Sequence, residues 1–252
     1  MKRLLLLLVL FILGLNNYSQ GKIFVSLDAS PTYSFRTYKL IDYSSGNSNL
    51  LSGKILYDSF KKYSDSTESP KFGFKISANI GYSINDKLVL TTGFHFNKIG
   101  YKIDKTLRVA HFVVNGNIIS SVYSDFKLDL YSNLYYFGIP IGIEYKICTF
   151  NKITLGLSIG SSIDFLVKHD TKDLPDSKEN YSEYSKIAVD INAGIQLGYI
   201  INDKFEVYLK PHFADYITPN VKINSTLSND LFVKINQYNY YGDIIFGLKY
   251  RL

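Results

Sequence analysis

Histidine, serine and aspartate occur in this chain at positions where they could perform acid–base chemistry. A histidine next to a serine hydroxyl and a carboxylate can act as a general base in hydrolysis. His95 and Asp243 both fall on the polar side of alternating segments, and Ser158 or Ser162 could lie close to them. The alternative is that these side chains only hydrogen-bond to one another in a polar interior, and this is what we predict. The four histidines are His95, His111, His169 and His212.

Other reactive groups are sparse in the sequence. Cys148 is the single cysteine, so it cannot form an intramolecular disulfide, and we expect a small residue in a turn there. Cysteine and histidine do not cluster at zinc-ligand spacing, and no glycine-rich phosphate loop leads from a strand into a helix. We therefore predict no catalytic, cofactor-binding or metal-binding residue, and a protein that is not an enzyme.

The composition indicates one large all-β domain. The 252 residues are 46% hydrophobic, yet the mean hydropathy is −0.01, because polar and apolar residues alternate instead of forming blocks. The chain has 22 Tyr and 17 Phe, which favour strands and membrane interfaces.

The first twenty residues have the pattern of a secretory signal peptide. Lys2 and Arg3 precede the apolar run 4–15, and a polar stretch with Ser19 follows. A membrane anchor helix needs about 20 apolar residues, more than this run provides. We expect 1–20 to be removed near Ser19 and 21–252 to form the folded domain. The net charge then falls from +6 to +4, which is mild and dispersed and does not indicate nucleic-acid binding.

The last fifteen residues show the clearest strand pattern in the chain. One face of 238–252 is apolar or aromatic apart from a glycine, and the other is mostly polar: Asn239, Tyr241, Asp243, Ile245, Gly247, Lys249 and Arg251. A period of two indicates a β-strand with one apolar face and one polar face. Similar alternation predicts seven more strands, in 23–36, 71–84, 88–97, 135–147, 153–168, 186–201 and 205–213.

The connections between these strands differ in length. Short turns are expected at 85–87, 148–152 and 202–204, and polar loops at 38–71, 169–182 and 218–236. The turns at 85–87 and 202–204 belong to a repeat, in which Gly81–Leu88 recurs as Gly198–Phe205. Asn-Asp is well suited to turn geometry.

A long hairpin is predicted between the third and fourth strands. Asn115-Gly116 between β-branched residues is a strong hairpin signal. Pairing Val114 with Asn117 places Phe94 opposite Phe137 and His95 opposite Tyr136. After Asn97 the apolar phase slips, either because the strand leaves the lipid or through a bulge. The alternative is that this region forms two more spanning strands.

The polar face carries charges of both signs, separated by glycines. This suits a narrow interior filled with ion pairs better than a solvated outer face, since glycine weakens exposed strands. These charges are Asp28, Arg36, Lys75, Glu144, Lys146, Asp164, Lys168, Asp190, Lys186, Glu206, Lys210, Asp243, Lys249 and Arg251. We therefore predict an all-β, eight-stranded antiparallel up-and-down transmembrane β-barrel. Its apolar face meets lipid, and Tyr136, Tyr208 and Tyr241 fill its interior.

Two rings of aromatic residues are expected on the lipid face. One near the short turns comprises Tyr82, Tyr145, Tyr199, Phe205 and Tyr250, and one near the loops comprises Tyr33, Phe72, Tyr135, Phe165, Phe213 and Tyr238. Such girdles are typical of barrels that cross a membrane.

The segment 136–145 (YFGIPIGIEY) and the end 246–252 (FGLKYRL) resemble the outer membrane protein beta-barrel domain family of Bacteroidetes. That family includes PorT-like proteins and is similar in architecture to the OmpA barrel. The resemblance implies integral insertion in the bacterial outer membrane, with both termini periplasmic. It implies contact with outer-membrane lipid and lipopolysaccharide, recognition of the last strand by the barrel-insertion machinery, and secretion-complex proteins as possible partners.

Function is predicted in broad terms from these observations. We expect a non-enzymatic outer-membrane barrel with a plugged polar interior, which is either structural or a partner-binding, secretion-associated component. The alternatives are a small-solute channel and a lipid-modifying barrel enzyme. Some outer-membrane barrels are enzymes, namely lipid A acylases, deacylases and omptin-like proteases. The segment Phe94-His95-Phe96-Asn97 lacks the His-x-Ser pattern of the deacylases.

Overall fold

The computed structural model describes residues 23–45, 68–115, 118–172, 180–228 and 231–252. The signal peptide predicted for 1–20 lies outside the described residues. Among the residues described, no helix combines the length and hydrophobicity that crossing a membrane requires. The strands are β1 (Ile23–Ser45), β2 (Glu68–Ser83), β3 (Leu88–Asn115), β4 (Ile118–Phe150), β5 (Ile153–Lys172), β6 (Asn180–Tyr184), β7 (Ile187–Ile200), β8 (Phe205–Tyr216), β9 (Val221–Ser228) and β10 (Leu231–Arg251).

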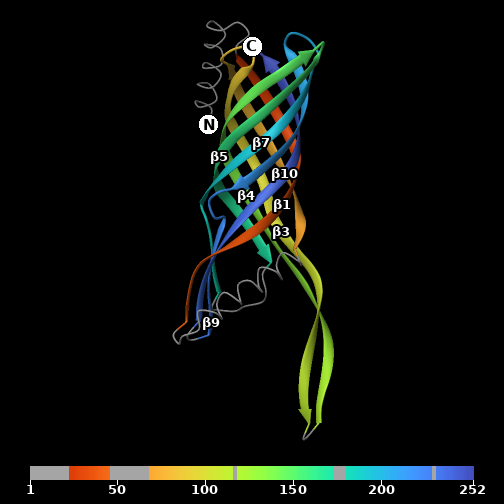
Figure 1. Ribbon diagram of the computed structural model, residues 1–252, viewed down its shortest axis with the longest axis vertical. Helices are drawn as coiled ribbons and strands as arrows, with labels where there is room; N and C mark the ends of the chain where they lie inside the picture. The colour runs from red at the N-terminus through yellow and green to blue at the C-terminus, as the bar shows by residue number, and fades with distance from the viewer. Residues whose placement is uncertain (1–22, 46–67, 116–117, 173–179, 229–230) are drawn as a thin grey trace.

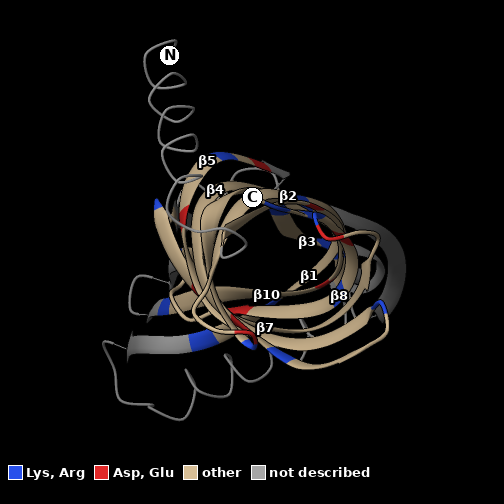
Figure 2. Cartoon of the chain, turned by 90° about the horizontal axis from the view of Figure 1, so that it is seen from above, with Lys and Arg blue, Asp and Glu red and all other residues tan. Residues whose placement is uncertain are grey.

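Eight of these strands close into a ring (Figures 1 and 2). Every pairing in the ring is antiparallel, and the order is β1-β2-β3-β4-β5-β7-β8-β10, with β10 returning to β1. Leu27 illustrates the closure, because it lies opposite Ala78 of β2 and Leu248 of β10. A ring has no edge on which backbone N–H and C=O groups would stay unpaired. The predicted eight-stranded up-and-down barrel is confirmed.

The two remaining strands lie where polar loops were predicted. β9 falls in 218–236 and β6 in 169–182. β10 pairs with β8 from Tyr240 to Tyr250 and with β9 from Leu231 to Gln237, and β6 pairs with the far side of β9. A small sheet therefore continues from the loop end of the barrel, which is the end opposite the short turns predicted at 85–87, 148–152 and 202–204 (Figure 1). Its strands were missed because both faces lie beyond the lipid, where no apolar face is required.

The long hairpin of β3 and β4 is confirmed, but its predicted register was wrong by two residues. Asn115 lies opposite Ile118, so that His95 faces Gly138 instead of Tyr136, and Phe96 faces Phe137. A two-residue shift preserves the face of every side chain, since the period of a strand is two. The apolar phase prediction therefore survived an incorrect register. The hairpin projects from the loop end as a twisted ribbon (Figure 1).

The two faces of the barrel wall have the predicted chemistry. Ile141 is 63% exposed on the outside, whereas Tyr136 is fully buried inside. Buried charges line the interior, including Lys75, Asp164, Asp190, Glu206, Lys210, Asp243 and Lys249. The outer band contains Leu27, Ile76, Leu90, Phe94, Phe137, Ile141, Ile159, Ile191, Phe213 and Phe246, all exposed. This distribution is the reverse of that in a soluble barrel.

Three lysines predicted to face inward are exposed, and one of them, Lys146, lines the open end of the barrel near the predicted turn at 148–152. The β4–β5 register shifts where Tyr135 lies opposite Lys168 and Tyr136 opposite Leu166, which leaves one extra residue in β5. The bulge turns Lys168 outward. Lys186, just before β7, is exposed as well. At the predicted phase slip in β3, Ile99 points inward and is fully buried.

The two copies of the repeat form matching turns. The side-chain oxygen of Asn85 accepts hydrogen bonds from the backbone N–H groups of Lys87 (2.9 Å) and Leu88 (2.8 Å). Asn202 makes the same two bonds with Lys204 and Phe205, each 2.9 Å long. These Asn side chains fix where one strand ends and the next begins.

Replacing a mid-barrel outward residue by lysine tests the assignment of faces. We expect Ile141→Lys to lower the free energy of unfolding by about 2–4 kcal/mol, because the ammonium group would enter hydrocarbon. Phe150→Lys is the matched control, since Phe150 is 73% exposed at the end of the same strand and should cost only about 0–1 kcal/mol. Denaturant titrations in lipid vesicles measure both, and equal losses would contradict the assignment.

Candidate functional site: the polar interior

Glycines on the inner face allow side chains of non-adjacent strands to meet. Strands lie about 4.8 Å apart, so a residue on the strand between two others normally separates their side chains. In the row His95–Gly138–Asp164, which crosses β3, β4 and β5, the middle residue has no side chain. A Cβ at Gly138 would lie 2.0 Å from Asp164 Oδ1 and 2.3 Å from His95 Nε2. The glycine thus creates the space in which histidine and aspartate make contact.

The His95–Asp164 pair is completely buried. His95 Nε2 lies 2.9 Å from Asp164 Oδ1, and both side chains are 0% exposed. Neither imidazole nitrogen has hydrogen-bond geometry toward any described partner, so the two groups meet as a close polar contact. Tyr216 donates a short hydrogen bond to the other oxygen of Asp164. The carboxylate is therefore held by groups from β3, β5 and β8.

Serine approaches this cluster through the carboxylates and not through the imidazole. The Ser162 hydroxyl lies 2.9 Å from Asp164 Oδ1 and 2.6 Å from Asp190 Oδ2. Activation of a serine nucleophile requires a base within hydrogen-bond reach of its hydroxyl. The bases within hydrogen-bond reach of Ser162 are the Asp190 carboxylate and the Asp164 carboxylate, which is already bonded to Tyr216. The arrangement orders the interior and does not form a nucleophile–base relay.

Asp243 contacts a different histidine from the one considered in the sequence. His212 Nδ1 lies 2.8 Å from Asp243 Oδ1, and the Ser30 hydroxyl donates to Asp243 Oδ2 over 3.1 Å. This unit repeats the Asp-centred arrangement of the first cluster. The structure therefore does not bring His95 and Asp243 together as a pair, and Ser158 contacts the carbonyl of Gly194. The β-strand register decides which histidine meets which acid.

A second glycine bridge joins β8 to β1. Gly247 of β10 lies opposite both Tyr208 and Asp28, and a Cβ there would lie 2.1 Å from the Tyr208 ring. The tyrosine passes over the glycine and donates a short hydrogen bond to Asp28. Asn79 and Ser77 donate to the other oxygen of Asp28 over 2.8 and 3.0 Å. The donors to the Asp28 carboxylate named here come from the wall strands β2 and β8.

Ion pairs concentrate toward the short-turn end. Glu144 accepts from Lys249 over 2.6 Å and from Lys210 over 3.5 Å, so one acid of β4 connects to β8 and β10 across the interior. Glu206 pairs with Arg251 at 2.9 Å and accepts from the Thr154 hydroxyl at 2.8 Å. Among the charges predicted to neutralise each other in a narrow interior, these five therefore do so.

Cavities remain between these layers in the described part of the barrel. One of about 80 Å³ lies among Asp28, Lys75, His95, Glu144 and His212. Another, of about 530 Å³, opens at the short-turn end and is lined in part by Glu144, Lys146, Glu206, Lys249 and Arg251. The inner cavity has room for a few water molecules at most, so the two do not join into a wide passage.

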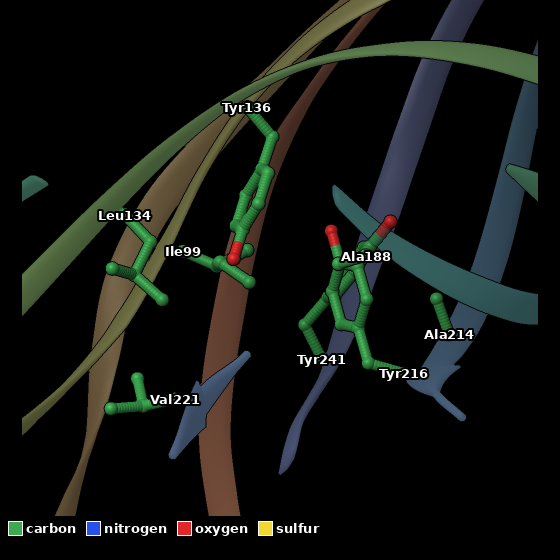
Figure 3. Packing of buried hydrophobic residues seen from close by; sticks show 8 residues of the cluster. All are labelled: Ile99, Leu134, Tyr136, Ala188, Ala214, Tyr216, Val221 and Tyr241. Carbon is green, nitrogen blue, oxygen red and sulfur yellow. The ribbon is translucent and has the colours of Figure 1, made fainter. Parts of the chain in front are cut away.

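An apolar and aromatic cluster fills the interior at the loop end (Figure 3). Tyr136, Tyr216 and Tyr241 are at most 1% exposed, with ring centroids 5.7 Å apart for Tyr136–Tyr216 and 6.3 Å for Tyr216–Tyr241. Ile99, Leu134, Ala188, Ala214 and Val221 complete the cluster. The plugging role predicted for Tyr136, Tyr208 and Tyr241 is borne out by their burial. Tyr216 was missed, although it continues the alternation from His212.

A network of amides covers this cluster. Asn220 donates to the Tyr136 hydroxyl over 3.0 Å and accepts from the backbone N–H of Asn239 over 2.8 Å. Gln237 donates to the side chain of Asn239 over 3.3 Å. Sequence reasoning placed Asn220 in a polar loop, and nothing local in the sequence indicates that it is buried. Only the pairing of β9 with β10 brings it over the barrel.

His169 and Cys148 lie outside the interior. His169 is exposed and stacks on Tyr184, with centroids 4.3 Å apart, and the side chain of His111 is outside the described residues. Cys148 lies in β4 and is exposed, not in the turn as predicted, since β4 extends to Phe150. Within the described ranges, no three His, Cys, Asp or Glu residues are arranged to hold a metal ion.

Comparison with known proteins agrees with this architecture. The model of the family described as outer membrane protein beta-barrel domain matches residues 43–214, more than half of the chain. A sequence search of curated proteins finds no match. OprG from Pseudomonas aeruginosa has the same fold, with a TM-score of 0.51 at 12% identity, covering 92% of this chain and 98% of OprG.

Two further solved structures align at lower scores. Neisserial surface protein A gives a TM-score of 0.45 at 15% identity, covering 91% of this chain and 97% of that one. The outer membrane protease OmpT from Escherichia coli gives 0.40 at 11% identity, covering 93% and 98%.

Adding one methyl group at a bridging glycine tests the interior. We expect Gly138→Ala to lower the free energy of unfolding by about 1–3 kcal/mol, because the Cβ would overlap Asp164 and His95. Gly242→Ala is the matched control, since its Cβ would meet only the His212 carbonyl oxygen, at 3.9 Å. Urea titrations in vesicles compare them. A Gly138→Ala protein as stable as the control would show that the glycine bridge is unimportant.

Proposed function

The chain belongs to the outer membrane protein beta-barrel domain family, and we propose that it is a non-conducting, non-catalytic outer-membrane barrel that presents the strands of its loop end to a protein partner. Proteins of this family are integral to the bacterial outer membrane. The observation that carries the proposal is the filled interior, because successive layers of buried side chains cross it from one wall to the other.

The lack of a passage is supported at three levels of the barrel. Glu144 connects to Lys210 and Lys249 near the short turns, and the His95–Asp164 contact occupies the middle. The cluster of Tyr136, Tyr216 and Tyr241 lies at the loop end. A solute would have to break paired charges and displace packed rings to pass, and both carry a large free-energy cost.

The absence of catalysis is supported by the order of contacts in the two histidine clusters. In each, the aspartate is central and touches both the histidine and a serine. A hydrolase needs the histidine between the other two, because the imidazole takes the proton from the nucleophile. Both clusters are also buried, where a lipid or peptide bond could not reach them.

Partner binding is supported by strands that continue beyond the lipid-facing band. The last exposed apolar residues toward the loop end are Phe94 on β3 and Phe137 on β4, but the ladder continues to Asn115 and Ile118. From Lys98 to the tip this amounts to about 55 Å of strand at about 3.3 Å per residue. Ordered backbone far from the membrane gives a partner a rigid surface with little entropy to lose.

The proposal includes an orientation and a class of partner. The short turns and both ends of the ring lie at one end (Figure 1), which we assign to the periplasm because outer-membrane barrels have short periplasmic turns. A secretion-associated assembly is the partner that the resemblance to PorT-like proteins implies. Recognition of the last strand by the insertion machinery belongs to the same proposal.

Conductance in planar bilayers tests the closed interior. We expect the wild-type protein to be silent. A triple variant with Tyr136→Ala, Tyr216→Ala and Tyr241→Ala should show measurable ion currents, because it empties the loop-end cluster. Steady conductance by the wild type would contradict the proposal.

The control for this experiment removes three tyrosines from the outer wall. Tyr33, Tyr82 and Tyr199 are each about half exposed on the lipid side, so their replacement by alanine should leave the bilayer silent. Currents from both triple variants would point to general loosening of the barrel instead of an opened plug.

Shortening the hairpin tests the partner-binding part. Asp104 lies opposite Asp129 in the ladder, so replacing 105–128 by an Asn-Gly turn should preserve the barrel. We expect this variant to retain heat-modifiable migration in gels and to lose the protein cross-links that the wild type forms in whole cells. A truncated protein that keeps every cross-link would contradict a binding role for the hairpin.

A further inference from the structure

Two lysines flank one tyrosine on the outer wall at the loop end. Lys98 of β3 lies opposite Tyr135 of β4, which in turn lies opposite Lys168 of β5. Each ammonium nitrogen lies 5.7 Å from the centroid of the same tyrosine ring. The two cations therefore converge on one ring from the strands on either side of β4. Their nitrogen atoms are no farther apart than twice that distance. Such positions are within cation–π range.

The height of this row places it at the boundary of the hydrocarbon. The next outward row toward the short turns is apolar and aromatic, formed by Phe96, Phe137 and Phe165. Phe96 contacts the Tyr135 ring at 6.3 Å between centroids. Toward the loop end, the outer surface changes within one row from phenylalanine to tyrosine flanked by lysines. This is the level at which aromatic side chains meet lipid head groups.

A bulge in β5 turns one of these lysines outward. Lys168 has the parity of the inner face, and without the β5 bulge it would point into the barrel. The bulge places it on the lipid side, where it is exposed. Strand bulges often redirect a side chain for function.

Neither lysine is neutralised by a described carboxylate. The ion pairs of Lys210, Lys249 and Arg251 lie elsewhere in the barrel. Asp170, the next acid along β5, accepts from the Asn133 side chain over 3.4 Å. The row thus presents two positive charges and a phenol to the lipid interface, which fits an anion with several acceptor oxygens.

We propose that Lys98, Tyr135 and Lys168 bind a phosphate group of the outer-leaflet glycolipid, lipid A of lipopolysaccharide. The two ammonium groups make charge-assisted hydrogen bonds to phosphate oxygens, and the tyrosine hydroxyl donates a third. The acyl chains lie on the adjacent phenylalanine row, toward the short turns. The glycolipid assignment rests on the proposed orientation, in which the loop end faces the cell exterior. The phosphate chemistry rests on the three side chains alone.

Titration of the purified full-length protein in detergent micelles tests the site, with native mass spectrometry counting bound lipid. We expect bisphosphorylated lipid A to bind about tenfold more tightly to the wild type than to a Lys98→Gln, Lys168→Gln variant, as loss of two charge-assisted contacts implies. The charge-preserving Lys98→Arg, Lys168→Arg variant should bind like the wild type. The matched control is Lys87→Gln, Lys204→Gln, which removes the same charge from the two exposed turns at the other end and should change nothing.

Comparing ligands on the wild type decides the proposal even where a variant fails to fold. Dephosphorylated lipid A should bind about tenfold more weakly than the phosphorylated form. Equal binding of the two, or equal weakening by the turn control, would overturn the site. Phosphatidylglycerol or inorganic phosphate binding as tightly as lipid A would overturn the glycolipid assignment. Protease cleavage of the β3–β4 hairpin on intact cells tests the orientation separately, and the micelle titration does not depend on it.

Discussion

Backbone hydrogen bonds that cannot be satisfied by lipid are the constraint on which this structure depends. Every strand of the wall must pair on both sides, and the pairing of β1 with β10 meets that condition for the last two edges. Closure with eight strands leaves an interior only wide enough for side chains. Because one face of each strand must be apolar for the lipid, the other face receives the polar and charged residues, and these have to satisfy one another.

Glycine solves the packing problem that this confined interior creates. Side chains from eight strands would collide if every inward position carried a side chain. The polar groups would then find partners only on adjacent strands. At Gly138 and Gly247 the missing Cβ lets His95 reach Asp164 and lets Tyr208 reach Asp28. The contacts tie together strands that share no backbone ladder. The wall and the interior therefore stabilise each other, and the filled barrel is the basis for proposing a role other than transport.

Outside the lipid the same strands follow different rules. β3 and β4 continue as a hairpin, and β10 changes its partner from β8 to β9 between Gln237 and Tyr240. Water can satisfy an exposed edge there, so the sheet can open and branch. The loop-end wall joins these two regimes, because it contains the boundary row around Tyr135 and, inside, the cover that Asn220 and Gln237 form over the aromatic cluster.

The sequence by itself determined the positions of the eight wall strands, the two faces and the tight turns, because a period of two is a local property and lipid imposes a strict chemical difference between the faces. It also identified Tyr136, Tyr208 and Tyr241 as interior residues. Only the tertiary structure decided which buried groups meet, since His95 with Asp164 and His212 with Asp243 depend on register across several strands. The outward turn of Lys168, and the strands β6 and β9 with the buried Asn220, likewise depend on a bulge and on long-range pairing. Alternation in one segment carries no information about either.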